Sequence, residues 1–242
     1  MALVLDYVAL ETRRTLRDTG FVIFGIGMPV LMYLLFTNIG GQADSGWKAA
    51  SMIGMAAYGA LGAALSAGTG VAEDKALGWL RQLRITPMTP AQVVLGRALT
   101  ASVVVLPAIL AVLAVGAVVN GVSMAVWQWA LVVLLLWFGS LPFTLLGIGN
   151  GYRLSAQSTG VVNVGCNLGF SILGGLWFPM QFFPGWLQGI GTYTPTRAIS
   201  QIGTSLGRGE APGVLAVVVL LGWLAIFGSY AVVSYRKAAR TA

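Results

Sequence analysis

Long runs without a charged side chain constrain the fold of this sequence more than any other feature. A hydrocarbon layer about 30 Å thick needs about 20 consecutive apolar residues per helix, and six runs of at least 18 residues have this character. Only 9% of the 242 residues are charged and 57% are hydrophobic, which excludes a water-soluble globule and a disordered chain. We therefore predict an all-α integral membrane protein with six transmembrane helices. The runs are approximately residues 21–39, 52–71, 98–119, 127–149, 159–178 and 213–234.

Positive side chains are concentrated in alternate loops. With six spans, the two termini and the loops on the same side hold 11 Lys and Arg residues, whereas the loops on the other side hold three. Because cytoplasmic loops carry the excess of positive charge, both termini are predicted to be cytoplasmic, in a bacterial plasma membrane. Membrane lipid also accounts for the net charge of +7, so nucleic acid is not an expected partner.

The residue types that the chain lacks narrow its function. It contains no His and a single Cys, Cys166, so a His-based triad, a His-ligated zinc site and an intramolecular disulfide are excluded. None of the six runs contains a charged residue, which disfavours proton-coupled transport and intramembrane hydrolysis. The nucleotide-binding pattern Gly-x-x-x-x-Gly-Lys-Ser/Thr does not occur either. We expect no catalytic residue, no metal site and no cofactor bound by this chain, so that uphill transport would take its energy from a separate subunit.

The longest loop on the predicted cytoplasmic side covers residues 72–97. Its side chains Ala76, Leu77, Leu80 and Leu83 follow helical spacing, which predicts a short amphipathic helix that ends before Pro87. A basic helix of this kind can lie on the surface of an anionic membrane. It can also dock against a partner protein, and composition alone does not separate the two roles.

The amino-acid sequence of this loop closely resembles that of the loop between the second and third spans of ABC type-2 exporter permeases. In residues 73–97, an acidic residue precedes Gly-Trp-Leu, a basic residue, Gln-Leu, a second basic residue, Thr-Pro and a hydrophobic run that ends in Gly-Arg. The N-terminal segment 1–19 is similar to the amphipathic connecting helix of that family. Residues 173–196 are similar to its external re-entrant element, which we expect over residues 179–210. The three segments occur in the order that the family has, so the resemblance covers essentially the whole chain.

The resemblance implies that the loop contains a coupling helix, which binds a separate ABC ATPase. Permeases of this family form dimers with two ATPase copies, and the ATPase subunits bind ATP and Mg²⁺. This chain would then be a transport subunit and not an enzyme, and both a homodimer and a heterodimer are compatible with its sequence. The candidate coupling residues are Glu73, Asp74, Trp79, Arg81, Gln82, Arg84 and Pro87.

Aromatic and proline residues are concentrated just before the last run. Pro179, Pro184 and Pro195 interrupt residues 179–202 too often for a spanning helix, and Trp and Tyr favour the headgroup level. Two short helices that dip into the membrane from its outer face are therefore expected. The aromatic side chains can simply anchor this loop, whereas the resemblance implies a lid over the transport pathway. Phe178, Pro179, Phe183 and Pro184 are the candidate gate residues.

The most polar stripe at membrane depth lies on the fifth run. Asn163 and Asn167 are one helical turn apart, and such side chains often form hydrogen bonds with a neighbouring helix. The resemblance instead implies that the first, second and fifth spans surround a central cavity between two protomers. On that basis the candidate pathway residues are Tyr33, Met55, Tyr58, Asn163 and Asn167, because Met and aromatic side chains give an adaptable wall for lipophilic cargo.

Small residues and proline also predict how the helices pack. Small residues four apart form faces that permit close helix approach: Gly147 with Gly151, Gly165 with Gly169, and Ala60, Ala64 and Gly68. Pro29, Pro107 and Pro142 lie inside the first, third and fourth runs, where each is expected to kink its helix.

We predict from these features the permease subunit of an ABC exporter. A lipophilic drug or antibiotic is the preferred substrate, since the spans are uncharged and contain Met and aromatic side chains, and the protein would then act in multidrug efflux and antibiotic resistance. A lipid or a lipid-linked glycan would require a similar wall. An ATP-independent secondary carrier and a membrane scaffold without transport activity are the alternatives from other functional classes.

Overall fold

All regular structure in the described part of the chain is helical, as predicted. The computed structural model describes residues 17, 19–38, 44–77 and 90–241. Its elements are the π-helix η1 (Phe21–Gly27), α2 (Met28–Asn38), α3 (Ser45–Ala76), α5 (Pro90–Val118), α6 (Val126–Gly139), α7 (Leu141–Arg153), α8 (Ala156–Leu173), the 3-10 helix η2 (Met180–Phe182), α9 (Gly185–Thr192), α10 (Pro195–Gly207) and α11 (Val214–Thr241).

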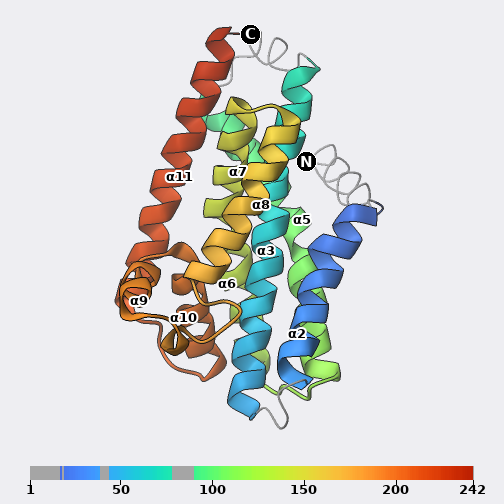
Figure 1. The fold of residues 1–242 in the computed structure, drawn as a ribbon, viewed down its shortest axis with the longest axis vertical. Helices are drawn as coiled ribbons and strands as arrows, with labels where there is room; N and C mark the ends of the chain where they lie inside the picture. Colours follow the sequence, from blue (N-terminus) through green and yellow to red (C-terminus); the bar gives the residue numbers. More distant parts are fainter. Residues whose placement is uncertain (1–16, 18, 39–43, 78–89, 242) are drawn as a thin grey trace.

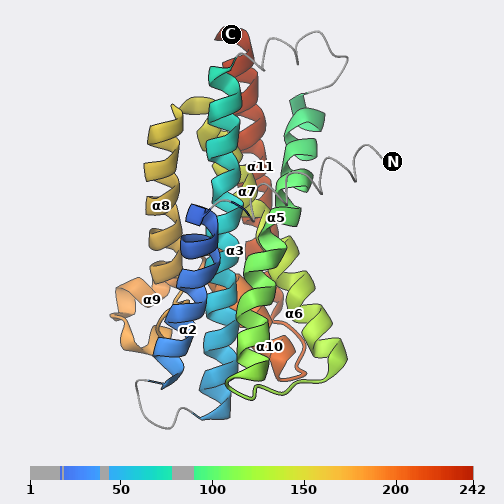
Figure 2. The same ribbon diagram turned by 90° about the vertical axis from the view of Figure 1, so that its right-hand side faces the viewer.

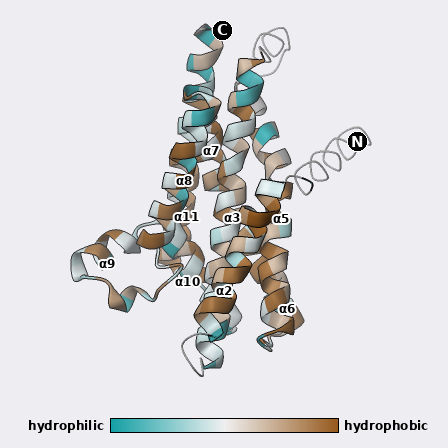
Figure 3. Cartoon of the chain, turned by 45° about the vertical axis from the view of Figure 1, so that its right-hand side comes forward, coloured by the Kyte–Doolittle hydropathy of each residue, from teal (hydrophilic) through white to brown (hydrophobic). Residues whose placement is uncertain are grey.

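The long helices run side by side along one axis, and a group of short helices lies at one end of the bundle (Figures 1 and 2). In the orientation of Figure 1, the upper end holds the end of α11, the last turns of α3 and the first turns of α8. The lower end holds α9, α10 and the connection from α5 to α6. Hydrophilic residues gather toward the upper end, whereas most of the bundle is apolar (Figure 3).

Five helical segments within the described residues are long and apolar enough to cross a membrane. They match five of the six predicted runs and support a multi-pass membrane protein. The remaining run forms α8, which has 18 residues but includes Asn163, Asn167 and two serines and does not reach the apolar character of the other five. The sixth span therefore stays a prediction. The five segments are Phe21–Asn38, Ser45–Ala76, Arg97–Val118, Val126–Arg153 and Val214–Arg240.

The loop predicted over residues 72–97 is shorter in the structure. α3 continues past residue 71 to Ala76 and takes Glu73, Asp74 and Lys75 into its last turns. The next helix, α5, already begins at Pro90. The prediction erred because it equated the helix with its uncharged part, whereas a helix can extend beyond the membrane when its charged end finds partners.

The fifth predicted span also ends earlier than expected, at Leu173 instead of residue 178. Gly175 follows with a φ of +66°, which glycine adopts at little cost, and the chain turns there into the external element. That element contains η2, α9 and α10, so the predicted pair of short helices is present. Whether they enter the membrane stays a prediction.

The fourth predicted span consists of two helices. α6 ends at Gly139 and α7 begins at Leu141, with Pro142 in the first turn, where its missing N–H costs no helical hydrogen bond. Ser140 joins the two helices and donates its hydroxyl to the carbonyl oxygen of Trp137 at 2.7 Å. The kink predicted near Pro142 is thus a break between two helices, whereas α5 continues past Pro107 as one helix. The kinks predicted at Pro29 and Pro107 stay predictions.

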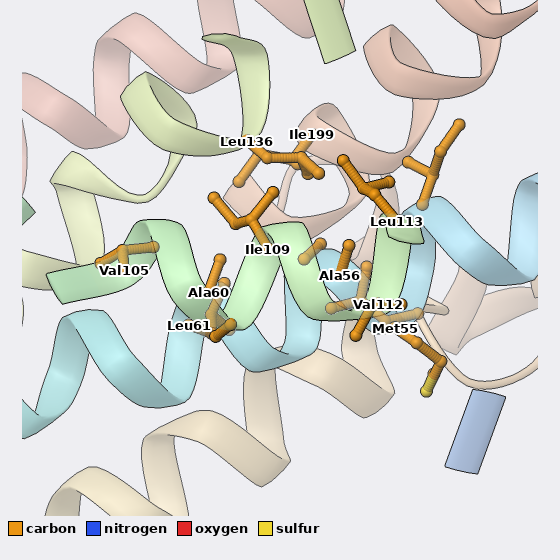
Figure 4. Close-up of a cluster of buried hydrophobic side chains, with 14 of the residues drawn as sticks. Met55, Ala56, Ala60, Leu61, Val105, Ile109, Val112, Leu113, Leu136 and Ile199 are labelled. Atoms are coloured by element: carbon orange, nitrogen blue, oxygen red, sulfur yellow. The ribbon is translucent and has the colours of Figure 1, made fainter. Parts of the chain in front are cut away.

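α3 is the central helix of the bundle. In its most apolar window 72% of the residues are buried, against 17% for both the first segment and α11. Ala60 of α3 lies close to Ile109 of α5, and Leu136 of α6 and Ile199 of α10 complete the same apolar cluster (Figure 4). The small side chains of α3 thus let the larger side chains of its neighbours approach its axis.

α3 and α7 cross with their backbones in contact. A Cβ atom at Gly68 or Gly151 would overlap a carbonyl oxygen of the other helix, and one at Gly147 would lie 2.6 Å from the carbonyl oxygen of Leu65. Because lipid is as apolar as the helix surfaces, tight packing replaces the hydrophobic effect as a source of helix association. The predicted close approach is confirmed at these residues, whereas Gly165 and Gly169 of α8 have open space around them.

We expect Gly68→Ala to destabilise the protein, because the added methyl group must push α7 away from α3. The expected cost is about 1–3 kcal/mol, which corresponds to a Tm lower by about 3–10 °C. Gly70→Ala is the matched control, since open space surrounds that position of the same helix and alanine favours the helical backbone. Thermal unfolding of both purified variants in one detergent measures the difference, and equal Tm values would contradict the crossing.

Candidate functional site

A cavity of about 700 Å³ lies between η1, α3 and α8 in the upper half of the bundle. We name it the upper cavity, and its volume falls in the range of small-molecule sites, about 300–1,000 Å³. Its three walls come from the first, second and fifth of the long runs, which are distant in sequence. Apart from four glycines, the residues that line it are Phe21, Phe24, Met28, Tyr58, Ser66, Thr69, Glu73, Val164, Asn167 and Leu168.

The wall of the upper cavity is mainly apolar, with a few polar groups at fixed places. Phe24 is 73% exposed and Met28 is also exposed, so the η1 side offers flexible apolar surface. Asn167 and Tyr58 supply amide and hydroxyl groups, and Glu73 places a carboxylate on the cavity wall at the end of α3. This combination suits a lipophilic molecule that carries a small number of polar atoms.

The structure brings two of the five candidate pathway residues to this cavity, Tyr58 and Asn167. Tyr33 and Met55 are completely buried in the core of the bundle, and Asn163 is 5% exposed. Tyr58 and Asn167 thus line a cavity, and their role in a pathway stays a prediction. So does that of the three buried residues.

Asn163 belongs to a buried chain of hydrogen bonds that joins four helices. Its amide nitrogen donates to the carbonyl oxygen of Leu65 in α3 at 2.7 Å, and its side-chain oxygen accepts from the amide of Asn150 in α7 at 2.8 Å. The hydroxyl of Tyr230 in α11 donates to Asn150 at 2.9 Å. Contact with neighbouring helices, the alternative that the sequence leaves open, is thus what the structure shows for Asn163.

A second cavity, of about 500 Å³, lies at the lower end between the start of α3, the turn after α8 and α10. We name it the lower cavity. The candidate gate residues Phe178 and Pro179 line it, whereas Phe183 and Pro184 are placed farther along, at the start of α9. Arg197 also lines this cavity, where burial lowers the pKa of its guanidinium from the ordinary value without removing its charge.

Two aromatic pairs stand beside the cavities. The ring of Tyr58, from the upper cavity, meets Trp177, from the lower cavity, edge to face at 5.4 Å between ring centres. Phe178 meets Phe36 of α2 at 5.2 Å. The first pair therefore joins the wall of the upper cavity to the wall of the lower cavity. Sequence reasoning did not select Trp177 or Phe36 as site residues, because nothing in their spacing distinguishes them from membrane-interface anchors.

The external element is fastened to the helices on both sides of it. The hydroxyl of Thr196 donates to the carbonyl oxygen of Phe170 in α8 at 2.6 Å. The indole of Trp223 in α11 donates to the carbonyl oxygen of Tyr193 at 2.8 Å. A movement of α8 or α11 would consequently be transmitted to the lower cavity.

Charged side chains join α3, α5 and α7 at the upper end. The ammonium group of Lys75 donates to three carbonyl oxygens at the C-terminus of α7, at 2.6–3.1 Å, where positive charge is favourable. Its neighbour Asp74 forms an ion pair with Arg97 of α5. These contacts explain why α3 continues beyond the apolar run.

The structure describes two of the seven candidate coupling residues. Glu73 is exposed and lines the upper cavity, and Asp74 is paired with Arg97. The segment 1–16, which resembles a connecting helix, is outside the described residues, and so are Trp79, Arg81, Gln82, Arg84 and Pro87. Within the described ranges, no three His, Cys, Asp or Glu side chains lie together as a metal site would require.

We expect Asn163→Leu to lower the stability of the bundle by about 1–3 kcal/mol, because Asn150 and the carbonyl of Leu65 each lose a buried partner. Asn167→Leu has the same change in shape, but within the described part of the chain the Asn167 side chain has only a long contact, at 3.4 Å, from the Ser171 hydroxyl. We expect a loss below about 1 kcal/mol there. Thermal unfolding in detergent compares the two variants, and a Tm loss at Asn167 as large as at Asn163 would contradict the network.

Comparison with known proteins gives two matches that agree with each other. The family model described as ABC-2 type transporter matches residues 7–206 of this chain. A curated protein of Bacillus subtilis (strain 168), the "Putative transport permease YvfS", is 26% identical over 222 residues and is covered over 90% of its length, as is this chain. The similarity therefore spans the helices that form both cavities.

Proposed function

The chain belongs to the ABC-2 type transporter family and is the membrane subunit of a transporter, and we propose that it exports lipophilic compounds, drugs and antibiotics foremost, with energy from a separate ABC ATPase. The upper cavity is the observation that carries this proposal. It is large enough for a drug-sized molecule, mainly apolar, and formed by three distant parts of the chain.

The proposed route runs from the upper cavity to the lower cavity. Substrate enters beside Tyr58 and Asn167 and passes the Tyr58–Trp177 pair when the helices around it move apart. Phe178 and Pro179 then act as the gate on the outer side. The contact between these rings, one from the wall of each cavity, supports such a barrier.

The proposed ATPase contact is the segment between α3 and α5, which carries Arg81 and Arg84. Nucleotide binding and hydrolysis then take place entirely on that partner. The links of Lys75 to α7 and of Asp74 to α5 support this role, because they would carry a push at the end of α3 into two other helices. On this assignment the upper end, where α11 ends, faces the cytoplasm of a bacterial cell. We propose the cytoplasmic side for both termini as well, from the distribution of Lys and Arg.

The proposed assembly contains two permease chains and two ATPase subunits. One face of α8 supports a second chain beside the upper cavity, since Val161 is 71% exposed and Val164 is 60% exposed. Gly165 and Gly169 have open space around them, so another helix can approach this face closely. The second chain would close the open side of the cavity.

Reversal of charge in the α3–α5 segment tests the ATPase contact. We expect the double variant Arg81→Glu, Arg84→Glu to lose copurification of the ATPase from native membranes by about tenfold or more, because like charges would then repel the docking surface. Mass spectrometry of the coeluting proteins measures this loss. The control is Arg236→Glu with Arg240→Glu, which changes the same charge on α11, and undiminished recovery with the Arg81/Arg84 variant would sink the docking assignment.

Truncation of a side chain in the wall of the upper cavity tests the export route. We expect Tyr58→Ala to lower ATP-dependent export of lipophilic antibiotics from cells about tenfold, the effect of about 1.4 kcal/mol of lost interaction. Phe138→Ala is the control, because this aromatic side chain is exposed on α6, away from both cavities. Unchanged export of every tested compound by the Tyr58 variant would refute the route. If the Tyr58 variant exports the antibiotics normally but exports less of a phospholipid or a lipid-linked glycan, a lipid substrate is favoured.

A further inference from the structure

The lower cavity gathers more hydrogen-bond donors than the protein uses. Ser51 comes from the first turns of α3, Trp177 from the turn after α8, and Arg197 and Arg208 from α10 and its C-cap. These positions are far apart in sequence. The tertiary structure, and no local motif, therefore brings the four donors to one space.

Two of these donors are buried and have no partner. Ser51 is 2% exposed, and neither its hydroxyl nor the indole N–H of Trp177 forms a hydrogen bond within the described part of the chain. Almost all buried polar groups in folded proteins are paired, since an unpaired one loses its water without compensation. Both side chains line the lower cavity, so a small rotation of each toward it would pair its donor with an acceptor atom of a ligand there.

The charge of the lower cavity is positive and uncompensated. The guanidinium groups of Arg197 and Arg208 form no ion pair or hydrogen bond with a described residue. No carboxylate lines this cavity. The acidic residues of this end lie elsewhere: Asp44 accepts the backbone N–H of Trp47 at the start of α3, and Glu210 is exposed on the loop before α11.

We infer that the lower cavity binds the phosphate group of an organic phosphate, with Arg197 and Arg208 as its charge partners and Trp177 and Ser51 as neutral donors. This inference goes beyond the proposed export function, because it concerns a ligand that the permease chain holds by itself. It can therefore be tested without transport or ATPase.

Phosphate fits this donor set better than carboxylate does. A phosphate has more acceptor oxygens than a carboxylate, and the planar fork of arginine matches them in pairs. The volume of about 500 Å³ leaves room for the organic part of the ligand. Gln181 and Gln201 also line the cavity, and their side-chain amides can bind hydroxyl groups next to the phosphate. The same chemistry occurs in an anionic phospholipid headgroup and in a soluble organic phosphate.

The indole of Trp177 provides a local readout of binding. The full chain is purified in a neutral detergent after labelling with 5-fluorotryptophan, and the fluorine resonance of Trp177 is assigned with Trp177→Phe. The probes are dihexanoyl phosphatidylglycerol, dihexanoyl phosphatidylcholine and glycerol 3-phosphate. We expect dihexanoyl phosphatidylglycerol to shift this resonance in a saturable way, about tenfold more tightly than the choline lipid, whose positive group opposes the two arginines.

Substitution of the arginines separates this site from general attraction to anionic lipid. We expect Arg197→Gln to weaken the titration at Trp177 about tenfold, and Arg197→Lys to keep part of the affinity, because the charge remains but the fork is lost. Arg240→Gln at the upper end removes an equal charge and should leave the titration unchanged. Size-exclusion chromatography checks that Arg197→Gln is folded. If its elution differs from that of the wild type, the same titration is made with Arg208→Gln and Ser51→Ala.

The probes also distinguish the sources of the phosphate. A shift with the phosphatidylglycerol alone identifies a lipid headgroup, and an equal shift with glycerol 3-phosphate identifies a soluble organic phosphate; both results support the site. The inference is overturned if no phosphate probe moves the Trp177 resonance, if the choline lipid binds equally well, or if the folded arginine variants titrate as the wild type does.

Discussion

The backbone contact between α3 and α7 at Gly68, Gly147 and Gly151 is the constraint on which the rest of the structure depends. A bundle in lipid gains little from the burial of apolar surface, so its helices are held by close packing and by interhelical hydrogen bonds. The hydrogen bonds that link Asn163, Asn150 and Tyr230 lie next to this crossing and fix how the helices are oriented there. With α3 fixed in the centre, η1 and α8 are placed along another of its sides, where the upper cavity remains.

The same central helix joins the two ends of the molecule. Lys75 and Asp74 tie its upper end to α7 and α5, and Ser51 lies near its lower end, in the wall of the lower cavity. Tyr58, between them, forms part of the upper cavity and meets Trp177 across to the lower one. α3 thus provides a mechanical connection from the proposed ATPase side to the external element. Its position would let one permease chain combine the proposed energy input, the cavity and the proposed gate.

The candidate site could be predicted only in part. The runs that line the upper cavity were identified, because long uncharged segments have few alternatives to a membrane helix. The separate roles of Asn163 and Asn167 could not be predicted, since both lie on one stripe and only the position of α7 decides which one is enclosed. For a similar reason the turn at Gly175 and the site residue Trp177 were missed: they depend on how α10 packs against α8.

The sequence by itself determined the fold class, most of the helices, the break near Pro142 and the family resemblance that the comparisons confirm. These properties follow from local features, namely hydropathy, proline stereochemistry and short sequence motifs. The tertiary structure decided where the cavities lie, which polar groups pair and which remain free. Such outcomes depend on contacts between residues far apart in the chain, as in the meeting of Ser51, Trp177 and Arg197 in one cavity, and no local pattern encodes them.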